Sequence, residues 1–461
     1  MRQLIIHSLL LSVLLSAACS TDNVAHDQPE IVDSVGEFQL LAIPSRWSVK
    51  AFVEAPSYFG NGHTVAGALW QDNDTYRYRF SRTDTGLDTA YFDYDHAAHG
   101  YAPEFYSTYV MPNGDVLFVF RTEFSGGSTT DSNRRNPVLY VAAEGYKAHV
   151  IDFGSSLKPS GWLQNVGAYY SYRHKALFIA EYTRGNLPTA RCWRVDEPIS
   201  DPANWHVVLE HDIVKPYGTG FKHFHTAQGD AYADVLYLTS GDDDTSSGIW
   251  ASTDGGQSFN QLGAYNRRQW RMLNMVFTPE YIFWASDDWS DSWPNHALWR
   301  ARRDFRGVLD PNSLVEVYNF RDLDRQSLIY GDRYLRLATY STVYLRKYNA
   351  LLLLDRDDDA VHNAIQLRVY DINEDKMHIA GEIRPTRAHA LWGFRCETVE
   401  IYPEDDEVLV SFAPRYEKLF SPPAGSDPDL NEFAVTLKVT RTDTTYRVTM
   451  HRPIVSRKIR R

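Results

Sequence analysis

The sequence predicts an all-β fold, and three observations support this prediction. No long stretch keeps the apolar period of a helix, whereas short runs of β-branched and aromatic residues recur along the whole chain. Gly, Asn, Asp and Pro separate these runs, as they do at the turns of antiparallel sheets. The runs also fall into blocks of similar length, which indicates a repeated structural unit.

Seven blocks, each with about four short strands, can be distinguished. They cover residues 49–93, 104–153, 165–211, 221–265, 269–320, 338–385 and 390–452. Four-stranded units repeated around an axis are typical of β-propellers, in which radial repetition leaves only short, protected edges. We therefore predict a seven-bladed β-propeller with four-stranded antiparallel blades, in which the run 38–43 closes the ring with the last blade. Two or three separate β-sandwiches are the alternative fold.

The amino-terminal segment predicts export. Arg2 is followed by an apolar run over residues 9–15 and by small residues just before Cys19. The segment resembles a bacterial lipoprotein signal, in which this cysteine is acylated, although Ser16 stands where leucine is usual; plain secretion is the alternative. We expect a signal over residues 1–19, a polar tether over 20–36 and one propeller domain over 37–461. The expected location is the outer membrane or cell surface, the periplasm or the medium.

The composition is that of a globular protein. Of 461 residues, 43% are hydrophobic and 23% are charged, which excludes a disordered chain and a multi-span membrane protein. The formal net charge of -12 argues against a general nucleic-acid binder, because neutralising phosphates needs a positive face. Because a multi-span membrane protein is excluded, a lipid on Cys19 is the only membrane attachment that we expect.

Besides Cys19, the chain contains Cys192 and Cys396. In an oxidising compartment these two residues can form a disulfide, and a buried free pair is the alternative. A zinc site that used both would need further ligands that the spacing does not reveal. The chemistry inferred below requires no cofactor, and a structural calcium or zinc ion is left open.

Residues 252–259, Ser-Thr-Asp-Gly-Gly-Gln-Ser-Phe, form the strongest local motif. The aspartate can accept hydrogen bonds from the amides of a turn, glycine permits positive φ, and the aromatic ring can pack between sheets. The motif resembles the Asp-box of sialidase-like propellers, which implies a turn between the third and fourth strands of a blade. Weaker relatives are expected at residues 194–205 and 81–86. The motif supports a fold and not a chemistry.

The first strand of each propeller blade lines the central channel, and one such run contains His223 and His225. Their side chains share one face because side chains alternate along a strand. Two histidines on one face can bind a metal, act as base and acid, or belong to a hydrogen-bonded core. In the preceding block, Tyr182 ends the second predicted strand and faces the same mouth, with Arg191 close behind it in sequence.

Aromatic and arginine side chains on neighbouring strands suggest a sugar-binding surface. Rings stack on pyranose faces, and guanidinium groups hold anionic substituents. The candidate substrate-binding residues are Tyr106, Tyr109, Arg121, Tyr172, Trp392 and Arg395. Filling of the interfaces between blades is the alternative role for these side chains.

Residues 221–242, the motif at 252–259 and residues 271–287 together look like exported bacterial propellers related to sialidases. More specifically, an exported all-β chain with a His, Tyr and Arg set and no evident carboxylate pair resembles the seven-bladed polysaccharide lyases that cleave ulvan, a sulfated algal polymer of rhamnose and uronic acid. The resemblance implies an anionic polysaccharide as the partner and substrate.

Cleavage by β-elimination fits the available side chains. The reaction removes the C5 proton of a uronic acid and expels the C4 oxygen, which requires neutralisation of the neighbouring carboxylate. We predict His225 and Tyr182 as base and acid, Arg271 or Arg191 as the neutralising group and His223 as a supporting residue.

Two other classes of function remain open. A sialidase-like hydrolase would need a carboxylate pair at one mouth, for which Glu181 and Asp287 are the candidates. A non-catalytic glycan-binding lipoprotein would use the same aromatic and arginine lining without an acid or a base.

Overall fold

The computed structural model confirms that the protein is mostly β. The structure describes residues 30–35, 38–42, 48–50, 65–72, 75–82, 89–94, 103–110, 116–122, 138–142, 148–159, 162–183, 188–213, 220–241, 245–263, 268–286, 297–319, 337–357, 365–383, 394–402, 407–414, 433–443 and 445–454. Within these ranges, the helical elements are the short 3₁₀ turns η2 (Pro202–Asn204), η3 (Arg268–Trp270), η4 (Pro311–Ser313) and η5 (Arg346–Tyr348). Among the described residues we find no helix with the length and hydrophobicity of a bilayer span.

Each predicted block contains one four-stranded antiparallel sheet, and we number the seven sheets in chain order. Sheet 1 contains β3 (Ser48–Lys50), β4 (Val65–Asp72), β5 (Thr75–Arg82) and β6 (Thr89–Tyr94). Sheet 2 contains β7 (Pro103–Val110), β8 (Val116–Thr122), β9 (Val138–Ala142) and β10 (Ala148–Val150). Sheet 3 contains β11 (Trp162–Ser171), β12 (Ala176–Tyr182), β13 (Thr189–Asp196) and β14 (Trp205–Asp212).

Sheet 4 contains β15 (Phe224–Asp230), β16 (Val235–Ser240), β17 (Gly248–Ser252) and β18 (Asn260–Gly263). Sheet 5 contains β19 (Met272–Phe277), β20 (Tyr281–Ser286), β21 (Ala297–Arg302) and β22 (Val315–Asn319). Sheet 6 contains β23 (Leu337–Leu345), β24 (Ala350–Asp357), β25 (Ile365–Asp371) and β26 (Lys376–Ile383). Sheet 7 contains β27 (Phe394–Tyr402), β28 (Glu407–Pro414), β29 (Phe433–Arg441) and β30 (Tyr446–Ile454).

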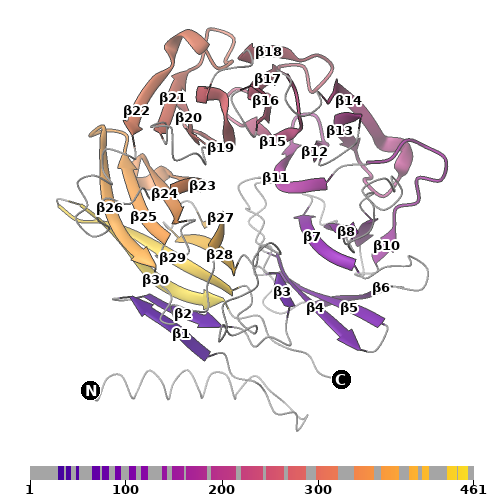
Figure 1. Ribbon diagram of the computed structural model, residues 1–461, viewed down its shortest axis with the longest axis horizontal. Helices are drawn as coiled ribbons and strands as arrows, with labels where there is room; N and C mark the ends of the chain where they lie inside the picture. Colours follow the sequence, from indigo (N-terminus) through magenta and orange to yellow (C-terminus); the bar gives the residue numbers. More distant parts are fainter. Residues whose placement is uncertain are drawn as a thin grey trace.

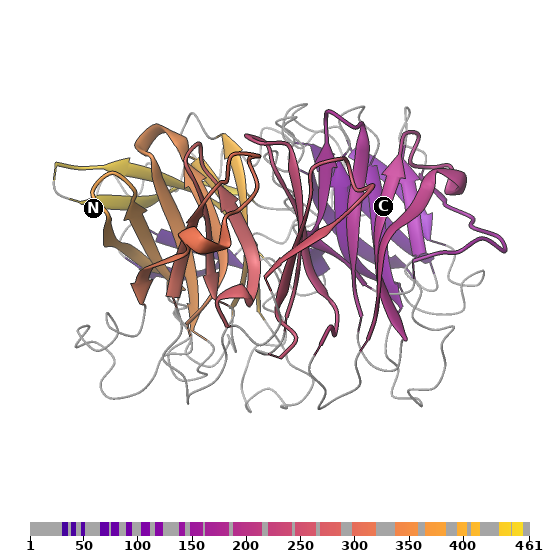
Figure 2. The same cartoon turned by 90° about the horizontal axis from the view of Figure 1, so that it is seen from above.

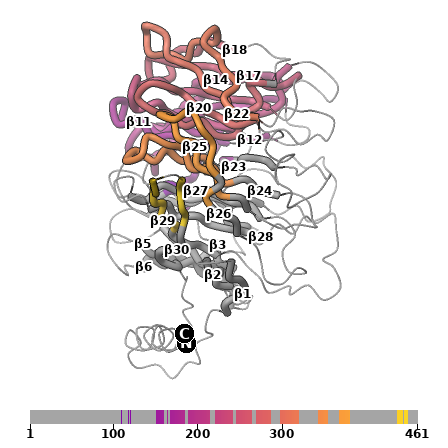
Figure 3. Tube along the Cα trace, turned by 90° about the vertical axis from the view of Figure 1, so that its left-hand side faces the viewer, coloured from indigo at the N-terminus to yellow at the C-terminus, as the bar shows by residue number. Residues whose placement is uncertain are grey.

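The sheets follow one another around a common centre, with the first strand of each sheet nearest to it (Figure 1). Figure 2 shows this arrangement turned by 90°, and Figure 3 shows the Cα trace from a third direction. Because successive strands of a sheet run antiparallel, the turns between first and second strands and between third and fourth strands lie on one rim. The other connections lie on the opposite rim.

The predicted closing strand has a different partner from the one expected. Residues 38–42 form β2 (Phe38–Ala42), which pairs with β1 (Glu30–Val35) in a two-stranded sheet and not with sheet 7. The strands are joined by only two residues, and Val35 lies opposite Phe38, so a local hairpin competes well with a long-range partner. In Figure 1 this hairpin lies beside β30.

Burial decreases from the centre outward. All residues of β16 and β17 are buried, whereas the outer strands β18 and β22 consist mostly of exposed and half-buried residues. The middle strands β16 and β17 are covered on both faces by neighbouring sheets, and they are therefore mostly apolar in place of an alternating pattern.

The core consists of separate clusters between adjacent sheets. Tyr109 and Trp193 belong to the cluster between sheets 2 and 3, and Tyr237 and Trp284 belong to the cluster between sheets 4 and 5. Each such cluster removes large aromatic surfaces from water, which stabilises the pairing of sheets and not only the individual sheets.

The motif at residues 252–259 forms the turn between β17 and β18, the third and fourth strands of sheet 4, as predicted. Asp254 Oδ1 accepts a hydrogen bond of 3.0 Å from the Ser258 amide, and the Ser252 hydroxyl donates to the same oxygen at 2.8 Å. Gly255 and Gly256 have φ values of +72° and +85°. Burial alone would raise the pKa of Asp254, but the hydrogen bonds from Ser258 and Ser252 lower it to about 2.

A second turn of this kind lies in sheet 5 and escaped the sequence analysis. Asp304 Oδ1 accepts hydrogen bonds from the amides of Arg306 at 2.8 Å and Val308 at 3.0 Å, and Gly307 has a φ of +83°. Of the weaker relatives predicted from sequence, the loop 194–205 contains Asp201, which caps η2 by accepting from the Ala203 amide at 2.9 Å. Residues 83–86 of the other lie outside the described residues.

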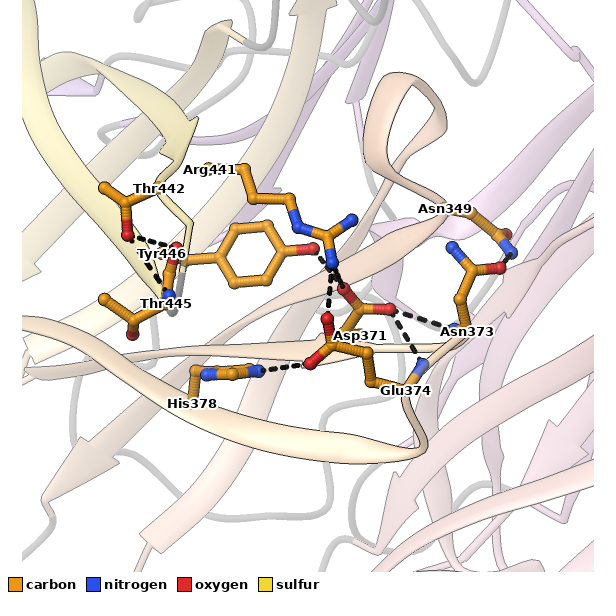
Figure 4. A network of polar contacts seen from close by, with 9 residues as sticks. All are labelled: Asn349, Asp371, Asn373, Glu374, His378, Arg441, Thr442, Thr445 and Tyr446. Atoms are coloured by element: carbon orange, nitrogen blue, oxygen red, sulfur yellow. Dashed lines mark hydrogen bonds and ion pairs between the residues drawn. The ribbon is translucent and has the colours of Figure 1, made fainter.

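A buried polar network joins sheets 6 and 7 (Figure 4). Asp371, at the end of β25, is fully buried and accepts a hydrogen bond of 2.6 Å from the Tyr446 hydroxyl. Arg441 Nη2 lies 3.2 Å from the same carboxylate, and the amides of Asn373 and Glu374 donate to it at 2.9 Å and 3.1 Å. The carboxylate therefore ties its own turn to the β29–β30 hairpin of the next sheet.

The Asp371 network should make stability depend on acid pH. Burial alone would raise the pKa of Asp371, but the bonds from Tyr446 and the amides and the charge of Arg441 lower it. Because this pKa lies below the unfolded value of about 3.9, the ionised carboxylate stabilises the fold above about pH 4, and this contribution disappears as the pH falls through the folded pKa. Asp371→Asn should lower the free energy of unfolding by about 1–3 kcal/mol at neutral pH.

Denaturant unfolding measures this effect, and the difference from the wild type should shrink below about pH 4. Asp443→Asn, an exposed change in the adjacent hairpin, is the control and should alter little at any pH. A loss at Asp371 that is equal at neutral and acid pH would contradict the role given to its charge.

Candidate active site

Tyr182, His223 and His225 lie together where sheets 3 and 4 meet. The ring centroids of Tyr182 and His223 are 4.0 Å apart, those of Tyr182 and His225 are 6.2 Å apart, and those of the two histidines are 5.2 Å apart. The structure thus brings these three predicted residues into one cluster, which we call the His-Tyr cluster. Their catalytic roles remain a prediction.

The strand pattern explains this grouping. Tyr182 is the last residue of β12, and Ala180, on the same face of that strand, belongs to the core between sheets 3 and 4. His225 is the second residue of β15, and His223 immediately precedes the strand. The Thr183 hydroxyl donates to the Lys222 carbonyl at 3.3 Å, so a direct bond holds the end of β12 against the start of β15.

His225 also links sheet 4 to sheet 5. Its Nδ1 lies 3.1 Å from the carbonyl oxygen of Met272, the first residue of β19, and the imidazole is only 2% exposed. A carbonyl can only accept, so Nδ1 is the nitrogen that carries the proton. In the neutral ring the basic lone pair is therefore on Nε2. The Thr239 hydroxyl donates to the same carbonyl at 3.4 Å.

The two predicted arginines differ in their surroundings. Arg271 is half-buried and directly precedes Met272, so it lies at the rim where His225 is bonded. Arg191 forms an ion pair with Glu210 of the outer strand β14. We therefore retain Arg271, and not Arg191, as the candidate neutralising group.

Glu181 is part of the packing between sheets. It is fully buried, and it accepts hydrogen bonds from Trp193 Nε1 at 2.8 Å and from the Arg191 amide at 3.1 Å. Its neighbour in the chain, Tyr182, faces the other side of β12, because side chains alternate. Asp287, the second carboxylate of the hydrolase alternative, lies outside the described residues. We do not carry that alternative further.

Two predicted substrate-binding residues lie elsewhere than expected. Tyr109 is buried in the core between sheets 2 and 3, where its ring packs against neighbouring side chains. Tyr172 follows β11 at the turn into β12, whereas Tyr182 pairs with Trp162 at the other end of this hairpin. The seven residues of β12 put Tyr172 and Tyr182 about 20 Å apart, on opposite rims.

The remaining predicted residues cannot be judged from the described part of the chain. Tyr106, Arg121 and Arg395 lie in β7, β8 and β27, but their side chains are not among those described. Trp392 and Cys19 lie outside the described residues.

Cys192 is a free, fully buried thiol, and burial raises its pKa. A disulfide from this residue is therefore not formed, while the side chain of Cys396 is not described. In the part of the chain that the structure describes, no group of three or more His, Cys, Asp or Glu side chains could hold a metal ion.

The sequence did not predict that the backbone at Gly241 packs against His225. A Cβ atom on Gly241 would lie 2.5 Å from His225 Cε1, so the backbone at Gly241 contacts the imidazole directly. On the other side of the strand pair, the hydroxyls of Thr226 and Thr239 are 2.9 Å apart. A glycine at the end of a predicted strand was the only sequence signal of this close approach.

Comparisons with known proteins support the fold. Neither a protein-family model nor a curated protein matches this chain. A solved prolyl endopeptidase is similar at a TM-score of 0.51 and 10% identity, over 89% of this chain and 51% of that chain, so this chain spans about half the length of that relative. The similarity shows the fold alone.

Two further solved structures are similar at lower scores. The β-propeller domain of the Trilobed protease from Pyrococcus furiosus has a TM-score of 0.40 and 10% identity, over 83% of this chain and 93% of that chain. An oligogalacturonate lyase in complex with manganese has a TM-score of 0.40 and 8% identity, over 89% of this chain and 97% of that chain. The described part of the chain is mostly β and consists of four-stranded antiparallel sheets and one two-stranded sheet.

The Gly241 contact gives a test of how His225 is held. Gly241→Ala should push the imidazole away from Met272, because the added methyl group and the carbonyl cannot both be accommodated. We expect a loss of about 1–3 kcal/mol in stability, as for other overpacked sites. In histidine-labelled protein, the His225 Nδ1 proton should exchange with solvent much faster than in the wild type.

Gly154→Ala is the matched control, because it strains a backbone with a φ of +53° but its methyl group would contact nothing within 4 Å. Unchanged exchange of the His225 proton in Gly241→Ala would show that the imidazole is not positioned by this contact.

Proposed function

We propose that the protein is an exported polysaccharide lyase that cleaves a uronic-acid-containing sulfated polysaccharide, ulvan, by β-elimination. The observation that carries the proposal is the contact between the rings of Tyr182 and His223, with His225 next to both, at the rim where β12 ends and β15 begins. An imidazole beside a phenol can supply the base and the acid that elimination needs, whereas glycoside hydrolysis ordinarily uses a pair of carboxylates.

In this mechanism each group has one task. His225 Nε2, the basic nitrogen, accepts the C5 proton of the uronic acid, and the electron pair moves to form the C4–C5 double bond. The Tyr182 hydroxyl gives its proton to the departing C4 oxygen. Arg271 neutralises the uronate carboxylate, on which negative charge accumulates, and His223 supports the ring of Tyr182. No step needs a cofactor, and the protons balance when His225 releases the C5 proton to solvent and Tyr182 regains one from it.

The proposal extends to the architecture and the location. The seven sheets would close into a seven-bladed propeller, with the catalytic groups at one mouth of its channel. An acylated Cys19 would hold the enzyme at the outer membrane or cell surface, where long anionic polymers are accessible; the periplasm and the medium are the other locations we consider.

A non-catalytic glycan-binding protein is the second candidate. The burial of both imidazoles favours it, since His223 and His225 are each below 5% exposed and could belong to a hydrogen-bonded core. Such a protein would retain the polymer and leave its length unchanged.

The test is incubation with ulvan and other uronate polymers. A lyase releases products with a conjugated double bond that absorbs in the ultraviolet, a hydrolase releases reducing ends without it, and a binding protein releases neither. Tyr182→Phe keeps the ring on His223 but lacks the hydroxyl, so turnover should fall about 100-fold or more with little change in melting temperature.

Tyr170→Phe is the matched control. It removes a hydroxyl that donates to Glu197 at 2.7 Å on the opposite face of sheet 3, and it should leave turnover unchanged. Equal activity of Tyr182→Phe and the wild type would contradict the assignment of the acid.

A further inference from the structure

Three turns lie in contact on the rim opposite the His-Tyr cluster. They join β11 to β12 (residues 172–175), β15 to β16 (residues 231–234) and β21 to β22 (residues 303–308), and we call them the turn surface. Arg173 binds Asp234 at 2.8 Å across the first two turns. In the third turn, a Cβ atom on Gly307 would lie 2.8 Å from that of Ala233, so the second and third turns also touch.

Each of these turns exposes one aromatic ring. Tyr172 is 51% exposed, Tyr232 is 45% exposed and Phe305 is 97% exposed. Wherever side chains are described, these three are the only exposed Phe, Tyr or Trp residues. These three exposed rings all lie on the turn surface and are not scattered over the molecule.

The rings of Tyr172 and Tyr232 are each in contact with one neighbouring side chain and are partly exposed to solvent. The ring of Tyr172 meets that of Tyr170 edge-on, with centroids 5.2 Å apart, and the Arg303 guanidinium lies 5.5 Å from the centroid of Tyr232. Arg303 is itself fixed by the buried carboxylate of Asp230 at 2.6 Å. A half-exposed ring supported on one side is a platform on which a sugar ring can stack, and little side-chain entropy is lost on binding.

The charges around the rings favour an anionic ligand. Both carboxylates of the turn surface are paired with an arginine, Asp234 with Arg173 and Asp304 with Arg306, and the buried Asp230 beneath it pairs with Arg303. Lys175 adds a further exposed cation. In a chain with a net charge of -12, this surface is neutral to positive, and the guanidinium groups of Arg173 and Arg306 are mostly exposed to solvent.

We infer that the turn surface is a second binding site for an anionic polysaccharide, separate from the active site. Pyranose rings would stack on Tyr172, Tyr232 and Phe305, and sulfate or carboxylate groups would pair with the exposed arginines. The inference rests on the proposed function for the class of polymer. It adds that the protein holds long chains at the rim opposite the one where it cleaves them, which raises the local concentration of polymer for the active site.

The test compares the double variant Tyr232→Ala/Phe305→Ala with the control Leu157→Ala, an exposed apolar residue in the connection between β10 and β11, on the other rim. Retardation of the full-length protein in gels containing ulvan measures polymer binding. The double variant should bind about tenfold more weakly, a factor that corresponds to about 1.4 kcal/mol, while Leu157→Ala binds as the wild type does.

A second readout separates this inference from the proposed function. The double variant should cleave short ulvan oligosaccharides at the wild-type rate, whereas Tyr182→Phe should be inactive but retarded by the polymer as strongly as the wild type. If the wild type lacks lyase activity and the double variant still loses retardation, the proposed function fails and the binding site stands.

Three results would overturn the inference. One is retardation of the double variant equal to that of the wild type. The second is equal retardation of the wild type by an uncharged β-glucan, which would remove the role of the arginines. The third is a loss that appears only with phosphatidylglycerol vesicles, or only as a change in self-association during sedimentation, which would assign the surface to a membrane or to a second copy of the chain.

Discussion

The burial of inner strands between neighbouring sheets is the constraint on which the rest of the structure depends. A four-stranded sheet such as β15–β18 cannot cover its own faces, and its inner strands are buried only because sheets 3 and 5 pack on both sides. Stability is therefore shared among the sheet interfaces, and each interface contains large aromatic side chains such as Trp193 or Trp284. A single sheet would expose most of its apolar surface and would not be stable alone.

This arrangement also creates the candidate active site. Tyr182, His225 and Met272 come from three consecutive sheets and are far apart in sequence, yet the inner strands bring their ends to one rim. Side chains of one sheet bind backbone carbonyls of the next: the Thr183 hydroxyl donates to the Lys222 carbonyl, and His225 binds the Met272 carbonyl. These bonds provide partners for buried backbone groups at the sheet boundaries. The geometry of the site is thus a consequence of sheet packing and not of any local motif.

The sequence predicted the repeated units better than their connections. Each strand block was visible because middle strands such as β16 are mostly apolar and turns such as that at Asp254 have strict requirements for glycine. Side-chain roles were harder to predict. Tyr109 and Tyr172 both lie near the end of the first strand of a sheet, but one lies in a core and the other on a turn, which depends on where the strand ends and on its register.

Sheets 4 and 5 are fastened at both ends of their interface. At one rim His225 binds the Met272 carbonyl, and at the other Asp230 binds Arg303 while the Leu309 amide donates to the Tyr237 hydroxyl at 2.9 Å. A pair of sheets held at two such distant points cannot splay open at one side without compressing the other. Complete separation of the two sheets therefore requires the loss of buried polar bonds at both rims.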